Sequence, residues 1–269
     1  MADVAARSDT GLVRERNEDR WLARDFAGVT LIAVADGVGG EAGGDVASSA
    51  AIGSLAKTFR PPSFRESART ALGDAVQRAN VAVLEAAKDE RYPRAATTLV
   101  AAAIRGREAA VANLGDSRAY LIRAAAIRQL TTDHSSEATN GITRFVGDPR
   151  GTQPDIFVET LQPGDRLVLC SDGLTRHVTD EEIAAAMASD PARAADALVA
   201  LARARGGEDN VTVIVYAARR PAIPRSLAGL LILALLILVA IAGALGALLS
   251  TPIPTEPTPT VSPGVAPSP

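Results

Sequence analysis

The distribution of apolar residues divides the chain into blocks of predicted strands and helices. Short apolar runs bounded by glycine or polar turn residues indicate strands, and longer runs with helical spacing indicate helices. The predicted strands are residues 21–26, 29–35, 97–104, 109–113, 119–123, 155–160, 166–170 and 211–216. The predicted helices are residues 44–59, 63–87, 180–188 and 191–204. Strands and helices arranged in blocks favour a layered α+β sandwich and not alternating βαβ units.

Capping signals set the expected helix ends. Pro61 and Pro62 close the first helix, and Ser63, with Glu66 three residues later, is the expected N-cap of the second. Asp190 is the expected N-cap of the last helix, because Pro191 suits the first helical position.

The C-terminal part of the chain has a different character. Residues 227–249 are 23 consecutive uncharged, mostly aliphatic residues, which at about 1.5 Å per residue can cross a hydrocarbon core of roughly 30 Å. A buried core helix is the alternative, but this length disfavours it. Arg219, Arg220 and Arg225 precede the segment and no basic residue follows it, so the positive-inside bias places the preceding domain in the cytoplasm.

We therefore expect a single-pass protein of the cell membrane. Residues 1–218 are the expected cytoplasmic domain and residues 219–226 a basic juxtamembrane linker. Residues 227–249 are the expected transmembrane helix, and residues 250–269 a Pro/Thr-rich tail outside the cell. The sequence begins without a signal-peptide pattern.

Composition narrows the possible chemistry. The formal net charge of -3 gives no support for nucleic-acid binding. The single cysteine excludes an intramolecular disulfide and a cysteine-based zinc site, and the presence of only two histidines disfavours a histidine-rich metal site. Any metal must therefore rely on Asp and Glu, which favours Mg²⁺ or Mn²⁺ over Zn²⁺.

Acidic residues recur at the ends of apolar runs or in glycine turns. They are Glu18-Asp19, Asp36-Gly37, Asp116, Asp172-Gly173 and Asp209-Asn210. Each Asp-Gly pair is also a common turn dipeptide. Gathered at one sheet edge, the carboxylates would repel one another unless cations neutralised them. Two divalent ions would do so and would make a water held between them a strong nucleophile near neutral pH.

Arg14 adds a group that can hold an anionic oxygen bidentately. Two metal ions, an activated water and an arginine fit the in-line hydrolysis of a phosphate ester.

A series of motifs resembles a known family. NED, ADGVGG, TTLVAA, NLGDSRAY, LTTDHS, ITRFVG, LCSDGLT and GGEDNVTVIV occur in the order found in the metal-dependent Ser/Thr protein phosphatases of type 2C. The resemblance runs from about Ser8 to Tyr216. The membrane-anchored arrangement is similar to bacterial enzymes that reverse Ser/Thr kinase signalling, so the implied partners are such kinases and their phosphorylated cytoplasmic substrates.

The resemblance implies a fold and a metal centre. The fold would be a four-layer αββα sandwich of two antiparallel sheets, with a Mn²⁺ or Mg²⁺ pair at one edge. Asp36 would bridge both ions, the Gly37 carbonyl would bind one, and Asp172 and Asp209 would complete the direct ligands.

The resemblance also implies supporting roles. Glu18 and Asp19 would act through metal-bound waters, with Asn210 nearby. Arg14 would bind phosphate, and Asp116 would hold a third, weaker ion shared with Asp172.

Two departures from the family pattern concern the surroundings of this site. Val38 stands where some eukaryotic members carry a histidine proposed as general acid, so the leaving oxygen needs another proton source. Between Asp133-His134-Ser135 and Ile142-Thr143-Arg144 only residues 136–141 remain, where bacterial relatives hold a longer flap. The short flap puts substrate selectivity and the third ion in question.

Cys170 and His134 each allow a structural and a catalytic interpretation. Residues 170–176 spell Cys-x5-Arg, the loop of cysteine-dependent phosphatases. Cys170 ends an apolar strand, however, whereas a reactive thiolate needs an accessible, electropositive setting, so we interpret it as a core residue. His134 is interpreted as a structural, hydrogen-bonded residue.

The principal functional hypothesis is a membrane-tethered phosphatase acting on phosphoserine and phosphothreonine in proteins. The alternative is a catalytically weak, membrane-anchored scaffold that binds phosphoproteins, supported only by the short flap. A cysteine phosphatase is the third hypothesis.

Overall fold

The computed structural model describes residues 3–38, 43–62, 67–136, 141–218 and Ile241. The chain separates into two units, residues 1–220 and residues 221–269. The sheets and helices described below belong to the first unit.

Two five-stranded antiparallel sheets form the centre of this unit. The first has the order β1 (Asp3–Asp9), β14 (Val211–Ala217), β13 (Arg166–Cys170), β8 (Arg118–Arg123) and β9 (Ala126–Gln129). The second has the order β12 (Asp155–Thr160), β7 (Glu108–Leu114), β6 (Leu99–Arg105), β3 (Val29–Ala35) and β2 (Arg20–Phe26). Two short pairs join β4 (Gly37–Val38) to β5 (Ala96–Thr97) and β10 (Ser135–Ser136) to β11 (Gly141–Ile142).

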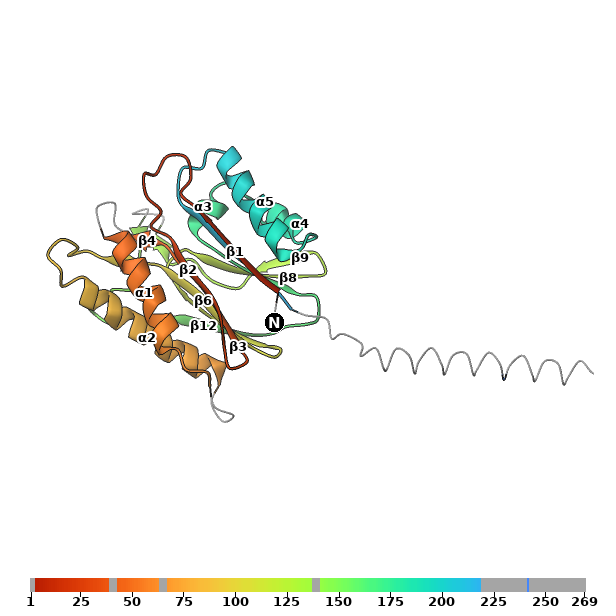
Figure 1. Cartoon of the computed structure of the whole chain (residues 1–269), viewed down its shortest axis with the longest axis horizontal. Coiled ribbons are helices and arrows are strands. Elements are labelled where there is room, and N and C mark those ends of the chain that lie inside the picture. The colour runs from red at the N-terminus through yellow and green to blue at the C-terminus, as the bar shows by residue number, and fades with distance from the viewer. Residues whose placement is uncertain (1–2, 39–42, 63–66, 137–140, 219–240, 242–269) are drawn as a thin grey trace, which may run out of the picture. The chain divides into compact units, whose positions relative to one another are not determined.

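Helices cover the outer face of each sheet (Figure 1). Helices α1 (Gly44–Thr58) and α2 (Ala68–Ala86) pack on the second sheet. Helices α4 (Asp180–Ala186) and α5 (Pro191–Ala204) pack on the first, and the short helix α3 (Asp172–Thr175) follows β13. The order helix, sheet, sheet, helix confirms the expected four-layer α+β sandwich.

The burial of β3 explains why its sequence is an uninterrupted apolar run. Leu31 and Ala33 face the cluster under α1 and α2, whereas Ile32 and Val34 face the cluster between the two sheets. Successive side chains of a strand point to opposite faces. A central strand with helices on one side and a second sheet on the other therefore needs apolar residues at every position.

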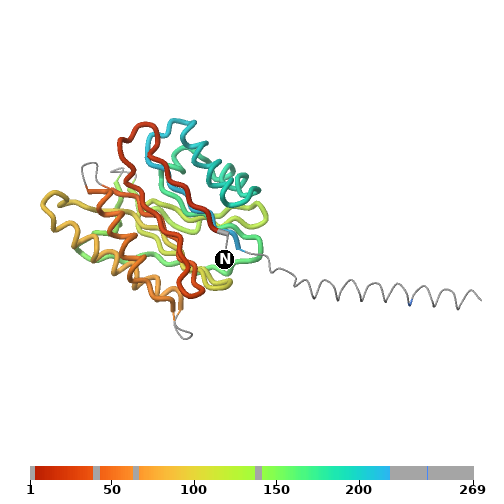
Figure 2. The backbone as a smooth tube through the Cα atoms, in the orientation of Figure 1, coloured from red at the N-terminus to blue at the C-terminus, as the bar shows by residue number. Residues whose placement is uncertain are grey.

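Strand β1 is an element that the sequence pattern did not reveal. It pairs along its whole length with β14, from Asp3 opposite Ala217 to Asp9 opposite Val211. Figure 2 shows these two strands, from opposite ends of the unit, lying side by side. Its sequence, DVAARSD, has only one large apolar residue, which suits an edge strand with partly exposed side chains.

One predicted helix begins too early, and one predicted strand is two strands in the structure. Helix α2 begins at Ala68, with Ser67 as N-cap accepting a hydrogen bond from the Thr70 N–H, and not after Ser63; residues 63–66 lie outside the described residues. The strand predicted over residues 97–104 is divided at Thr98, where the N–H of the opposite residue, Asp36, donates to the Thr98 side-chain hydroxyl.

No helix within the described ranges is long and apolar enough to cross a membrane. The predicted linker, transmembrane helix and tail, residues 219–269, lie outside those ranges except for Ile241.

Candidate metal centre

One pocket brings together most of the acidic residues singled out in the sequence. It has a volume of about 280 Å³ and is lined by loops at one edge of the two sheets. Its carboxylates are Glu18, Asp36, Asp116, Asp172 and Asp209. Asp19 lies behind them, nearly fully buried.

Asp36 directly follows β3, and hydrogen bonds fix both its backbone carbonyl and its backbone N–H. Its carbonyl accepts hydrogen bonds of 2.8 Å from the Thr97 hydroxyl and from the Thr98 N–H. Its N–H donates to the Thr98 hydroxyl at 3.1 Å. These bonds fix the position from which the Asp36 carboxylate enters the pocket.

Gly37 follows Asp36 at a point where the backbone passes very close to helix α1. A Cβ atom at Gly37 would lie 2.4 Å from the backbone of Gly44. A Cβ atom at Gly44 would in turn lie 2.7 Å from the Glu18 carboxylate. Glycine is needed at both positions so that the Gly37 backbone can line the pocket beside Glu18.

Asp172 and Asp209 enter the pocket from different elements and both contact arginines. Asp172 is the first residue of α3, and its Oδ2 accepts hydrogen bonds from Arg176. Asp209 precedes β14, and its Oδ2 lies 2.9 Å from Nη2 of Arg14. Within the described residues, no group of three His, Cys, Asp or Glu side chains is already arranged to hold a metal ion.

Three carboxylate oxygens near this pocket are buried without a hydrogen-bond partner among the described residues: Oδ1 of Asp19, Asp116 and Asp172. The second oxygen of Asp19 accepts a hydrogen bond of 2.8 Å from Ser171. Buried acceptors without donors are costly unless another group satisfies them. Carboxylate oxygens are the preferred ligands of hard divalent cations, so the residues present fit a Mg²⁺ or Mn²⁺ site.

The electrostatics of the pocket lead to the same conclusion. Burial, followed by the charges of Asp19 and Asp172, raises the pKa of Asp36 well above its usual range, although the carboxylate keeps some surface at the pocket. Burial raises the pKa of Asp19 to about 6, and burial with the Asp172 charge raises that of Asp116 to about 6. Burial also raises the pKa of Glu18. Without cations, the site therefore resists full ionisation.

His134 holds the turn that presents Asp116. Its ring Nδ1 accepts a hydrogen bond of 3.1 Å from the Gly115 N–H, and the backbone N–H of His134 donates to the Gly115 carbonyl. Its Nε2 lies 2.9 Å from Asp155. A buried ring with these contacts is what the structural interpretation of His134 predicts.

Cys170 has none of the properties of a nucleophile. It is fully buried on β13, and burial raises the pKa of its thiol to about 12. An inaccessible thiol that stays protonated cannot attack phosphate, so the structure removes the basis for a cysteine mechanism.

Val38 and the described residues at the C-terminal end of the short flap lie at the pocket. Val38, Gly141 and Ile142 line it, and the flap ends pair as a small hairpin in which Ser135 is opposite Ile142. Residues 137–140 lie outside the described residues.

Sequence reasoning missed Arg176 as a pocket residue and the full role of Asn210. The spacing of Arg176, four residues after Asp172 in a helical turn, is the signal that would have found it. The contacts of Asn210 join distant parts of the chain, so no local pattern reveals them.

Comparison with known proteins agrees with this geometry. A family model described as protein phosphatase 2C matches residues 13–205. The serine/threonine phosphatase stp of Listeria monocytogenes is 33% identical over 234 residues, which cover 78% of this chain and 93% of that protein. The serine/threonine protein phosphatase PstP of Mycobacterium tuberculosis is 36% identical over 233 residues, which cover 78% of this chain and 44% of that protein.

A solved structure shares the fold. The catalytic domain of the phosphatase PstP, in complex with two manganese ions, superposes with a TM-score of 0.73 at 34% sequence identity. The match covers 81% of this chain and 99% of that chain. Because the family model spans most of the chain and its relatives exceed 30% identity, the chain belongs to the protein phosphatase 2C family.

Proposed function

We propose that the protein is a Mn²⁺- or Mg²⁺-dependent phosphatase that hydrolyses phosphoserine and phosphothreonine in other proteins. The observation that carries the proposal is the pocket in which five carboxylates and two arginines converge. A protein that only bound phosphate would need the arginines but not the buried, partnerless carboxylate oxygens.

The positions of the side chains support the ligand roles that the motifs imply. Asp36, Asp172 and Asp209 would be direct ligands, together with the carbonyl of Gly37. Two bound ions would supply charge neutralisation, polarise the phosphate ester and activate a water for attack. Glu18, which lines the pocket, and Asp19, which is buried, would hold waters in place.

A third, weaker ion would involve Asp116 and Asp172. Both have a buried Oδ1 with no hydrogen-bond partner in the described part of the chain. Burial and then the charge of Asp172 raise the pKa of Asp116, so a cation near both would favour their ionised forms.

Arg14 would bind and orient the substrate phosphate. Its side chain is about half exposed and contacts Asp209 at the pocket. A guanidinium can donate two parallel hydrogen bonds to phosphoryl oxygens. Since Val38 supplies no acid and the described lining includes no histidine, the leaving oxygen would take its proton from water.

Membrane attachment is a further part of the proposal. The uncharged segment 227–249 and the preceding Arg219, Arg220 and Arg225 support a single-pass anchor with the phosphatase domain on the cytoplasmic side. Anchoring would raise the local enzyme concentration near membrane-bound Ser/Thr kinases and their substrates. Carbonate extraction of cell membranes tests the anchor: release of the full chain into the soluble fraction would refute it.

The catalytic proposal is tested with the full chain in detergent and p-nitrophenyl phosphate as substrate. Hydrolysis should require Mn²⁺ or Mg²⁺ and stop with EDTA. If metal-loaded, folded protein released no phosphate from this substrate or from any phosphopeptide, the scaffold hypothesis would replace it.

A further inference from the structure

Arg176 is the pocket arginine to which the sequence motifs assign no role. It caps the C-terminal end of α3 and, with Arg14, is one of two cationic side chains among the described lining residues. Its side chain is 52% exposed, so the guanidinium is accessible from solvent. The Cys-x5-Arg pattern pointed to this residue, although its cysteine is inert.

Among the described residues, the polar contacts of the Arg176 side chain are with carboxylates of the site. Its Nε donates to Oδ2 of Asp172 at 3.0 Å, and its Nη2 donates to the same oxygen. Its Nη1 lies 3.7 Å from Oδ2 of Asp209, the oxygen that also contacts Arg14. Both guanidinium groups therefore approach one carboxylate oxygen, close enough for a single tetrahedral anion to contact both.

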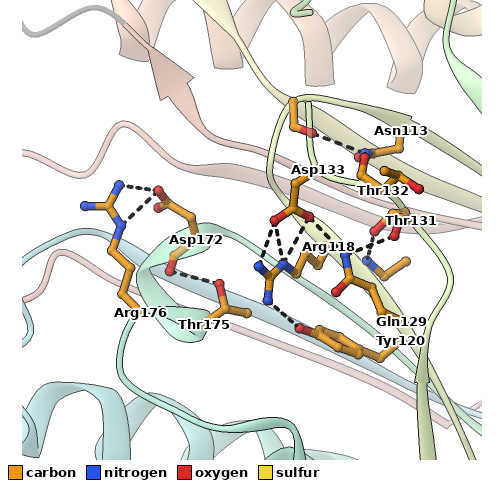
Figure 3. A network of polar contacts seen from close by, with 12 residues as sticks. Asn113, Arg118, Tyr120, Gln129, Thr131, Thr132, Asp133, Asp172, Thr175 and Arg176 are labelled. Carbon is orange, nitrogen blue, oxygen red and sulfur yellow. Dashed lines mark hydrogen bonds and ion pairs between the residues drawn. The ribbon is translucent and has the colours of Figure 1, made fainter. Parts of the chain in front are cut away.

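The base of the Arg176 side chain is fixed while its tip remains accessible. The N–H of Arg176 donates to the Asp172 carbonyl at 3.0 Å, as does the Thr175 hydroxyl at 3.3 Å. Figure 3 shows Arg176 and Asp172 turned toward each other, apart from the network around Arg118. Arg118 is the contrasting case, because it is held by Asp133 and also donates to the hydroxyl of Tyr120.

The charge of the pocket indicates what Arg176 binds during function. Divalent cations on Asp172 and Asp209 would compete with both arginines for the negative charge of the same carboxylates. Guanidinium groups displaced from these oxygens would remain beside the cations, and phosphate offers oxygens in the geometry that a guanidinium fork matches.

We propose that Arg176 is a second phosphate-binding residue that, together with Arg14, holds the phosphoryl oxygens of the substrate and of released phosphate. This assignment rests on the proposed phosphatase function. It differs from a purely structural role, in which Arg176 would only balance the charge of Asp172.

Binding of inorganic phosphate to the Mn²⁺-loaded full chain tests the proposal without relying on turnover. Isothermal titration calorimetry would compare the wild type with Arg176→Gln, Arg176→Lys and the control Arg7→Gln. Arg7 is a suitable control because it is 41% exposed and pairs with Asp196 on the outer side of β1 and α5. The Mn²⁺ affinity of every variant is measured in parallel.

Arg176→Gln should weaken phosphate binding about tenfold, as expected for loss of one charge-assisted interaction. Its Mn²⁺ affinity should be unchanged or tighter, because a competing cation is removed. Arg176→Lys should be intermediate and Arg7→Gln unchanged, and KM for a phosphothreonine peptide should follow the phosphate affinity.

Unchanged phosphate affinity in Arg176→Gln, or a loss fully explained by weaker Mn²⁺ binding, would overturn the assignment while leaving the phosphatase function intact. Phosphate binding that depends on Arg176 in a protein without phosphopeptide turnover would support the assignment and overturn the phosphatase function instead.

Discussion

The side-chain oxygen of Asn210 accepts a hydrogen bond of 2.8 Å from the backbone N–H of Glu18, across 192 positions of sequence. The amide nitrogen of Asn210 donates to the carbonyls of Thr10 and Arg16, each at 2.9 Å. One buried amide thus fastens the loop that carries Arg14 and Glu18 to the start of β14. Asn210 therefore positions pocket residues through their backbone.

Replacing Asn210 with Asp should loosen this loop. A carboxylate cannot donate the two hydrogen bonds and would face two carbonyl oxygens. We expect a loss of about 2 kcal/mol in the free energy of unfolding, measured with urea, and a higher KM for phosphopeptide. Asn80→Asp is the control, since this buried amide on α2 contacts Gly147 and Asp148 and does not line the pocket. An Asn210→Asp protein with wild-type stability and KM would contradict the positioning role.

The glycine after Asp172 should be intolerant of substitution. A Cβ atom at Gly173 would lie 2.1 Å from the Asn210 carbonyl oxygen, which is backbone and has little room to move. Gly173→Ala should cost at least about 2 kcal/mol in unfolding free energy and displace Asp172. Gly53→Ala is the matched control, because its Cβ would contact nothing within 4 Å, and it should stabilise α1 by about 0.5–1 kcal/mol. Equal effects of the two substitutions on thermal unfolding would refute this explanation.

Cys170→Ser should leave the turnover of folded enzyme within about twofold of wild type, since no step uses the thiol. Burying a hydroxyl in its place should lower unfolding free energy by about 1–2 kcal/mol. The kcat per Mn²⁺-binding molecule, together with a thermal melt, checks both effects. Loss of kcat with Mn²⁺ binding retained would restore the cysteine mechanism.

The raised pKa values predict how pH affects the metal-free protein. The folded-state pKa of Asp116 is about 6, above the ordinary carboxyl pKa of about 4, so the protonated side chain favours the folded state. This contribution to stability is fully present at pH values below about 4 and is lost as the pH rises through 6. In EDTA, Asp116→Asn should therefore stabilise the protein by about 1.5 kcal/mol more at pH 7.5 than at pH 4.5, a figure that allows for partial solvent screening. Urea unfolding at the two pH values measures this difference, and an equal effect at both would show that burial does not oppose ionisation of Asp116.

Metal ions should offset the stability that the metal-free protein loses when the carboxylates of the pocket ionise. At pH 7.5, Mn²⁺ should raise the melting temperature of the wild type, because ions that bind only the folded state stabilise it. The rise should be smaller at pH 4.5, where protons compete for the carboxylates. A rise of equal size at both pH values would argue against binding through these carboxylates.

The sequence predicted elements whose signal is local. The apolar run Leu31–Ala35 marked a buried strand, and the turn after it placed Asp36 at the strand end. Strand β1 was not predicted, because its side chains are partly exposed and it is stabilised by pairing with β14, which is far away in sequence. The same limit applies to the site, where the contact of Arg14 with Asp209 exists only once β1 and β14 are paired.

The most direct test of the account is release of phosphate from a phosphothreonine peptide by the full chain, wild type and Asp36→Asn, with Mn²⁺ or EDTA. Asp36 lies at the end of β3 among the carboxylates that line the pocket, and its amide replacement keeps the shape but removes the charge that a cation needs. The account predicts Mn²⁺-dependent release by the wild type and a loss of at least about a hundredfold, or 2.7 kcal/mol in barrier, for folded Asp36→Asn. Release that continues in EDTA, or that survives the loss of this carboxylate, would contradict a metal-dependent mechanism at this site.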